Sequence, residues 1–176
     1  MMSRLRLFRQ TSGSAAAETA LIVPLLLTLL FGGIEVGNYF LDEHAMVKQV
    51  RDGARYASRL PLATSYTCPS TVSPAAQTTI VNVTKTGTVD GSGAPTARFS
   101  TAYWARNCAG VAQAVTVTIR CVPEDDYTGV WAEWPGDIPV VRVSAAVGYR
   151  SLLDTLGLPS ASLCLRAESE IPAMGS

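Results

Sequence analysis

The stretch GSAAAETALIVPLLLTLLFGG, residues 13–33, decides the architecture of this chain. Residues 19–34 carry no charge, but a helix of that length spans only about 24 Å, short of the roughly 30 Å of a bilayer's hydrocarbon layer. Adding Ala15–Ala17 reaches the required length, and it draws Glu18 into the membrane edge. An ionisable group at that depth is costly and usually has a partner, so Glu18 is a candidate functional residue.

The charges around this stretch predict its orientation. Arg4, Arg6 and Arg9 precede it without any acidic residue, and the next basic residue is Lys48. This asymmetry is typical of a helix whose amino end stays in the cytoplasm. A cleaved secretory signal and a buried core helix are the alternatives. A signal would end at a cleavage site of small residues, whereas this run continues into a further helical pattern.

Four segments follow from this reading: a basic leader (1–13), a transmembrane helix (14–38), a helical extension (39–60) and an extracytoplasmic β-rich domain (61–176). We expect one helix from about Ser14 to Leu60. Arg51, Arg55 and Arg59 form an i, i+4 ridge that we interpret as a solvated face; a contact for acidic groups of a neighbour is the alternative. The apolar stripe expected to pack on the domain consists of Val36, Phe40, Val47, Val50, Ala54 and Ala57.

The remaining sequence predicts a small antiparallel sheet. A short helix is expected around residues 75–83, a loop at 87–96 and a helical turn at 151–159. Strands are expected at 114–122, 140–149 and 163–171, because apolar and polar residues alternate there. A sheet with one polar face has to cover its other face, and the extension of the long helix is available for that. The predicted fold class is therefore α+β. The expected inward-facing residues are Val115, Val117, Ile119, Cys121, Val141, Val143, Val147, Tyr149, Leu163, Leu165, Ala167 and Ile171.

Cys68, Cys108, Cys121 and Cys164 all follow the membrane stretch, which predicts two disulfides. A strand from residue 114 to 121 would span over about 20 Å, which disfavours a bond between Cys108 and Cys121. We prefer Cys68–Cys108 with Cys121–Cys164; Cys68–Cys121 with Cys108–Cys164 stays open. One pattern opposes the preference, since Cys121 lies on an apolar face and Cys164 alternates with charged residues.

Composition disfavours catalysis and nucleic-acid binding. Lysine plus arginine and aspartate plus glutamate both number 14, so no overall charge indicates nucleic acid. His44 is the single histidine, and no C-x-x-C pair is present, so we expect neither acid–base catalysis by histidine nor zinc nor a cofactor. Glu124–Asp126 is interpreted as a solvated acidic turn rather than a calcium loop. The aromatic residues interpreted as core or sheet cover are Tyr103, Trp104, Tyr127, Trp131 and Trp134.

A glycine (Gly13) after a basic leader, a glutamate (Glu18) five residues later, an apolar helix and the continuation ARYASR resemble the amino-terminal signature of the TadE-like family. These are pseudopilin-type proteins of tight-adherence (Flp) pilus assembly. The resemblance covers residues 13–59, and it departs at Thr19, where relatives commonly carry a bulkier residue.

The resemblance implies cleavage after Gly13 by a prepilin peptidase, which creates a new amine on Ser14. It also implies that Glu18 pairs with the amine of a neighbouring subunit and sets their axial register; snorkelling to the cytoplasmic headgroups is the simpler alternative. Gly33 and Gly37 form a small-xxx-small pattern for close helix approach.

Implied partners are the prepilin peptidase, other pseudopilins, the major pilin, the inner-membrane assembly platform and membrane lipids. The implied location is the bacterial inner membrane with the domain in the periplasm, and entry into a pilus stays open. An unprocessed membrane-anchored binding or adhesion module is the main alternative function, and an anchored enzyme is a second one.

Overall fold

The protein is α+β, with one long helix followed by small antiparallel sheets. The computed structural model describes residues 12–94, 98–106, 108–126, 128, 136–156 and 163–175. The chain divides into two compact units, residues 1–38 and 39–176. Helix α1 (Ser12–Ala57) contributes residues to both units and contains Pro24. The expected continuous helix is confirmed.

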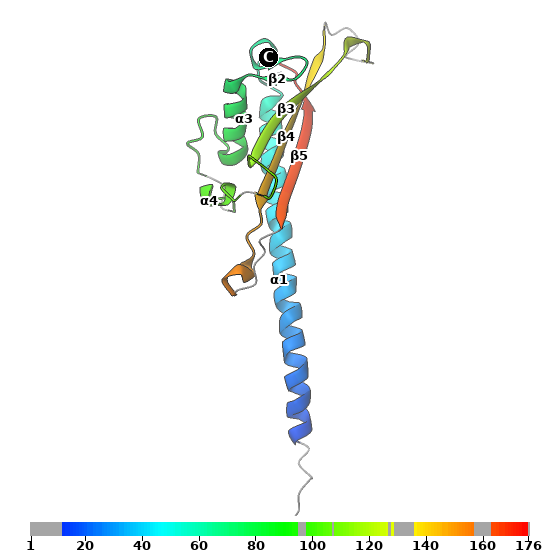
Figure 1. Cartoon of the computed structure of the whole chain (residues 1–176), viewed down its shortest axis with the longest axis vertical. Helices are drawn as coiled ribbons and strands as arrows, with labels where there is room; N and C mark the ends of the chain where they lie inside the picture. The colour runs from blue at the N-terminus through cyan, green and yellow to red at the C-terminus, as the bar shows by residue number, and fades with distance from the viewer. Residues whose placement is uncertain are drawn as a thin grey trace, which may run out of the picture. The chain divides into compact units, whose positions relative to one another are not determined.

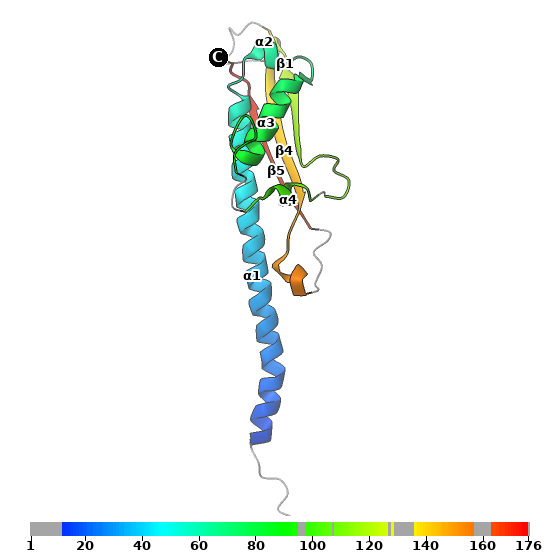
Figure 2. The same cartoon turned by 90° about the vertical axis from the view of Figure 1, so that its left-hand side faces the viewer.

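The second unit is built around a three-stranded sheet (Figures 1 and 2). Strands β3 (Val115–Val122), β4 (Ile138–Gly148) and β5 (Cys164–Pro172) are antiparallel in the order β3-β4-β5. All three lie within two residues of their predicted bounds. A second, two-stranded sheet pairs β1 (Tyr66–Thr67) with β2 (Thr71–Val72), and the sequence pattern did not predict it.

One face of the three-stranded sheet is covered by the part of α1 after residue 38 and by α3 (Pro74–Thr86). The alternation of β3 and β4 matches the prediction, because the predicted inward-facing valines and Ile119 are buried. Their neighbours are exposed in most of β3 and mostly partly buried in β4. Leu163 is the exception, since it precedes β5 and is exposed. The core is formed by Met46, Val50, Ala54, Ala57, Ala76, Ile80, Phe99, Tyr103, Trp104, Val115, Val117, Ile119, Val141, Val143, Val147, Tyr149 and Leu165.

The buried stripe of α1 differs from the predicted one. Val50, Ala54 and Ala57 are buried as expected, whereas Phe40 is 52% exposed and Val47 is only partly buried. The predicted stripe was chosen from apolar residues at helical spacing. This choice missed two polar residues and also Met46 and Gly53 on the covered face. The buried positions that this pattern excluded are Asp42, Met46, Gln49 and Gly53.

Helix α3 has local signals at both ends. The Ser73 side chain accepts a hydrogen bond from the Ala76 amide at 3.3 Å, and Pro74 occupies the first helical position. Gly87 ends the helix with a left-handed backbone (φ 75°), and its amide donates to the Val83 carbonyl at 2.9 Å. The helix predicted around residues 75–83 is confirmed.

The two disulfides are Cys68–Cys121 and Cys108–Cys164, with Cα–Cα distances of 5.9 and 5.8 Å. The preferred pairing is therefore wrong, and the alternative is present. Strand β4 lies between β3 and β5, and Cys121 is opposite Pro139 whereas Cys164 is opposite Gly148. These positions are separated along β4 by about 30 Å at roughly 3.3 Å per residue. Cys121 and Cys164 therefore lie at opposite ends of the sheet.

The remaining elements are short. They include α2 (Leu62–Ser65), α4 (Thr101–Trp104), and the 3-10 helices η1 (Glu124–Asp126) and η3 (Leu152–Leu156). The helical turn predicted at 151–159 corresponds to η3, and residues 87–94 form the predicted loop without helix or strand. Tyr103 and Trp104 are buried, as predicted. Tyr127, Trp131 and Trp134 lie outside the described residues.

Candidate functional site

The predicted processing segment lies in the first turns of α1. Gly13, Ser14 and Glu18 are all helical and exposed. Ser14 and Glu18 are four residues apart and therefore lie on the same helix face, one turn from each other. Within the described part of the chain, the Glu18 carboxylate has no hydrogen-bond or ion-pair partner. A carboxylate near a helix amino terminus is also favoured by the helix dipole.

An exposed apolar surface follows Glu18. Residues from Leu21 to Ile34 include a series of leucines that are about half or more exposed. Helix α1 is long enough, and this part of it apolar enough, to cross a membrane. The helix is thus compatible with a single-pass anchor. Thr28 donates its hydroxyl to the Pro24 carbonyl at 2.8 Å, so its polar group is satisfied within the helix.

Gly33 and Gly37 leave open space on the helix. A Cβ atom built on either glycine would meet no other atom within 4 Å. Both glycines are exposed, so their surface is available to another helix. This geometry is compatible with the predicted packing role, which stays a prediction.

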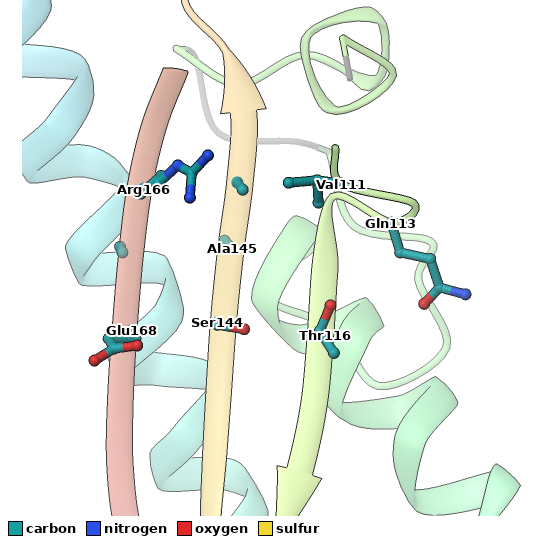
Figure 3. Close-up of a pocket in the computed structure, with 9 residues that line it drawn as sticks. Val111, Gln113, Thr116, Ser144, Ala145, Arg166 and Glu168 are labelled. Carbon is teal, nitrogen blue, oxygen red and sulfur yellow. The ribbon is translucent and has the colours of Figure 1, made fainter. Parts of the chain in front are cut away.

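The open face of the three-stranded sheet carries a shallow depression of about 380 Å³ (Figure 3). Its floor is formed by small residues of β4, and Arg166 on β5 extends over it toward β4. Figure 3 shows Thr116 on the β3 side, and Gln113 points away from the sheet. The lining combines small residues with the polar or charged side chains of Gln113, Arg166 and Glu168, which suits a polar surface contact. The lining residues are Val111, Gln113, Thr116, Ser144, Ala145, Ala146, Arg166, Ala167 and Glu168.

Charged side chains cross the same open face beside the depression. The Arg142 guanidinium lies 3.3 Å from Glu168 and 2.9 Å from Glu170, and Arg120 lies 3.8 Å from Glu170. All four side chains are largely exposed, so these pairs contribute little to stability. Arg120 lies on the edge strand β3, and Glu168 and Glu170 lie on the edge strand β5. Charged side chains on edge strands disfavour pairing with other chains.

The structure also joins three polar residues that sequence reasoning did not bring together. Asp42 on α1 is buried and accepts a hydrogen bond from Arg98 Nε at 2.6 Å and from the Tyr103 hydroxyl at 3.0 Å. The Tyr103 hydroxyl in turn accepts from the Arg150 amide at 3.3 Å. Burial raises the pKa of Tyr103, and the charge of Asp42 raises it further. The only sequence signal for this contact was the acidic residue Asp42, which lies beside the apolar stripe predicted for the helix.

The residues tested as metal or catalytic candidates remain dispersed. Among the described residues, no three His, Cys, Asp or Glu side chains gather into a metal-binding group. Glu124, Asp125 and Asp126 are exposed in η1, and His44 is exposed on α1. The four cysteines are consumed in the two disulfides.

Comparison with known families finds a match within α1. Residues 13–55 match the family of TadE-like proteins. The match begins at Gly13 and ends two residues before α1 does, so it includes none of the sheet. A TadE-like segment suggests a function related to tight-adherence (Tad/Flp) pili, and the family consists of pilus components that are not known as enzymes. No curated protein and no solved structure matches the chain.

Proposed function

We propose that this chain is a minor pseudopilin-like component needed to assemble tight-adherence pili, and that a prepilin peptidase cleaves it after Gly13. The observation that carries the proposal is the TadE-like match over residues 13–55, which starts at Gly13 itself. The exposed apolar surface of α1 after Glu18 supports it, because such a surface needs lipid or another helix to cover it.

The position of the Gly13–Ser14 bond suits cleavage. Both residues lie at the exposed amino-terminal end of α1. Terminal helical turns open more easily than central ones, so this bond can be presented to a peptidase without unfolding the domain. Cleavage leaves Ser14 as the new terminus, with a charged amine one helical turn from Glu18.

Glu18 then pairs with the amine of a neighbouring subunit. Two opposite charges at the membrane edge contribute little net stability when paired, but removing one partner leaves a charge whose cost is roughly 3–5 kcal/mol. The pair therefore specifies the axial register between subunits more than it strengthens their association. Further along α1, Gly33 and Gly37 allow the helix of a neighbouring subunit to approach closely.

The proposed location is the bacterial inner membrane, with the amino end in the cytoplasm and residues 39–176 in the periplasm. Three arginines before the span and none within it favour that orientation. Two disulfides in the second unit fit an oxidising compartment. The proposed partners are other pseudopilins, the major pilin, the assembly platform, the prepilin peptidase and membrane lipids.

The function is tested by deleting the gene in its host and restoring it with variants, while pili are counted by electron microscopy. We expect deletion to abolish piliation, wild type to restore it and Glu18→Gln to fail although the protein accumulates normally. Glu43→Gln is the matched control, because Glu43 is another carboxylate on α1 that lies outside the proposed register site. Normal piliation in the deletion strain would contradict the proposal and favour an unprocessed binding or adhesion module.

A further inference from the structure

Exposed apolar side chains gather at one end of the second unit. They are Phe40 and Leu41 on α1, Leu152 at the start of η3, and Leu163 just before β5. Each is at least half exposed. The other exposed large hydrophobic side chains in the described part of this unit are Val89 and Met174. Large apolar side chains grouped on a surface indicate a contact with lipid or protein.

Contacts at both ends of β4 place the four residues at the same end of the unit. At the start of β4, the Pro139 carbonyl accepts from the Ala173 amide, and the next residue, Met174, donates to Ser58 near the carboxyl end of α1. At the other end, the rings of Tyr149 and Tyr39 lie 5.2 Å apart. Strand β4 therefore runs from the carboxyl end of α1 toward Tyr39.

The direction of β4 also determines at which end of the unit Leu152 and Leu163 lie. The Tyr149 amide donates to the Leu163 carbonyl at 2.8 Å, so Leu163 lies at the Tyr39 end. Figures 1 and 2 show η3, which begins with Leu152, beyond the end of the sheet and away from the carboxyl terminus. Phe40 and Leu41 directly follow Tyr39 in α1. We call this end, defined by Phe40, Leu41, Leu152 and Leu163, the apolar foot.

The polar groups beside the apolar foot are of the kind found at membrane surfaces. Tyr39 is partly buried there and stacks edge to face on the buried ring of Tyr149, and Arg150 is exposed next to Tyr149. The Arg106 guanidinium lies 3.7 Å from Asp154 and donates to the Tyr149 carbonyl. Tyrosines and snorkelling arginines are enriched where apolar and headgroup layers meet.

We propose that the apolar foot rests on the outer surface of the bilayer that α1 spans, with Leu152 and Leu163 at the boundary between headgroups and acyl chains. This inference rests on the proposed function, because only a spanning helix brings lipid to this level. Tyr39 is five helical residues after Ile34, or about 7 Å, and the polar layer on each side of the hydrocarbon is roughly 5–8 Å thick. The foot therefore begins within the headgroup layer, and Arg150 is positioned to contact phosphate groups.

The test measures depth at single positions in the full chain. A nitroxide is attached through a non-natural ketone side chain at residue 152, 174 or 25, so that the disulfides stay intact. The protein is reconstituted in vesicles of phosphatidylethanolamine and phosphatidylglycerol, and the label's accessibility to oxygen is compared with its accessibility to a water-soluble nickel chelate. Met174 is the matched control, since it is 54% exposed and lies at the opposite end of the unit. Leu25 reports the span.

We expect the oxygen-to-nickel ratio at residue 152 to be several-fold higher than at 174 and lower than at 25. A ratio at 152 equal to that at 174, with a lipid-like value at 25, would overturn the apolar foot and leave the membrane anchor of the proposed function intact. A water-like value at 25 would overturn both. Protection of residue 152 from both reagents would show that protein covers the foot, and the lipid contact would be rejected.

Discussion

Asp42 and Arg98 form a short charged contact between α1 and the segment before α4: Nε lies 2.6 Å from Oδ1 across 56 residues of sequence. The Asp42 side chain is 6% exposed, and the Arg98 side chain is 37% exposed. Together with the Tyr103 hydroxyl, Arg98 compensates a carboxylate that would be costly to bury alone. The contact fixes α1 against the segment before α4, at the end of the domain where Tyr39 meets Tyr149.

Removing Arg98 should therefore destabilise the domain. We expect Arg98→Met to lower the free energy of unfolding by about 2 kcal/mol, less than the roughly 3–5 kcal/mol of a fully buried pair because water reaches part of Arg98. Arg142→Met is the control, since its ion pairs are exposed and should contribute at most about 1 kcal/mol. Denaturant unfolding followed by near-ultraviolet circular dichroism measures both. Equal effects of the two variants would contradict the role of Asp42.

The disulfide pattern makes a second prediction. Proteolysis without reduction should release peptides that join Cys68 to Cys121 and Cys108 to Cys164, identified by mass spectrometry. Each bond closes a loop of more than 50 residues, so replacing either pair by serine should cost about 4 kcal/mol on chain-entropy grounds. Detection of a Cys121–Cys164 peptide as the main species would be inconsistent with the order of the strands.

Gly53 lies where α1 meets α3, and it has no space for a side chain. A Cβ atom there would collide with the Thr84 hydroxyl, which is itself buried and bonded to the Ile80 carbonyl. Overpacking costs about 1–3 kcal/mol, and the better helix propensity of alanine returns about 1 kcal/mol. We expect Gly53→Ala to lower the unfolding temperature, and Gly53→Ala with Thr84→Ala to be less harmful than the sum of the single changes. A higher unfolding temperature for Gly53→Ala would refute this packing.

The domain should lose stability at alkaline pH. Burial raises the pKa of Tyr66 and of Tyr103 above the ordinary value of 10.0. The folded state then holds these protons more tightly than the unfolded state does, so their contribution is complete below about pH 10 and is lost as the pH rises further. The Tyr66 hydroxyl donates to the Ala57 carbonyl at 2.6 Å. Tyr66→Phe should lower stability at pH 8 and weaken its fall above pH 10; an unchanged alkaline slope would argue against this assignment.

The sequence predicted the elements whose signal is local. Alternation of apolar and polar residues in β3 and β4 indicated which side chains face inward, and Ser73, Pro74 and Gly87 mark the ends of α3. The length of the apolar run and the helical pattern that follows it predicted the long helix. Each of these signals lies within a single element and needs no knowledge of its neighbours.

The errors arose where the answer depended on which elements meet. The disulfide pairing depends on β4 lying between β3 and β5, and no spacing between cysteines encodes that order. The buried face of α1 includes Asp42 because Arg98 and Tyr103 arrive from distant sequence. Apolar periodicity assigns such a residue to solvent. Leu163 was assigned to the core by alternation, although the strand begins only at Cys164.

The roles of Gly13, Ser14 and Glu18 remain proposals, and the amino-terminal sequence of the membrane-extracted protein tests them most directly. It is measured with and without a co-expressed prepilin peptidase, for the wild type and for Gly13→Ala. We predict a new terminus at Ser14 that requires the peptidase and disappears in Gly13→Ala. An intact leader in the wild type under both conditions would contradict the processing claim and leave an unprocessed, membrane-anchored module as the better account.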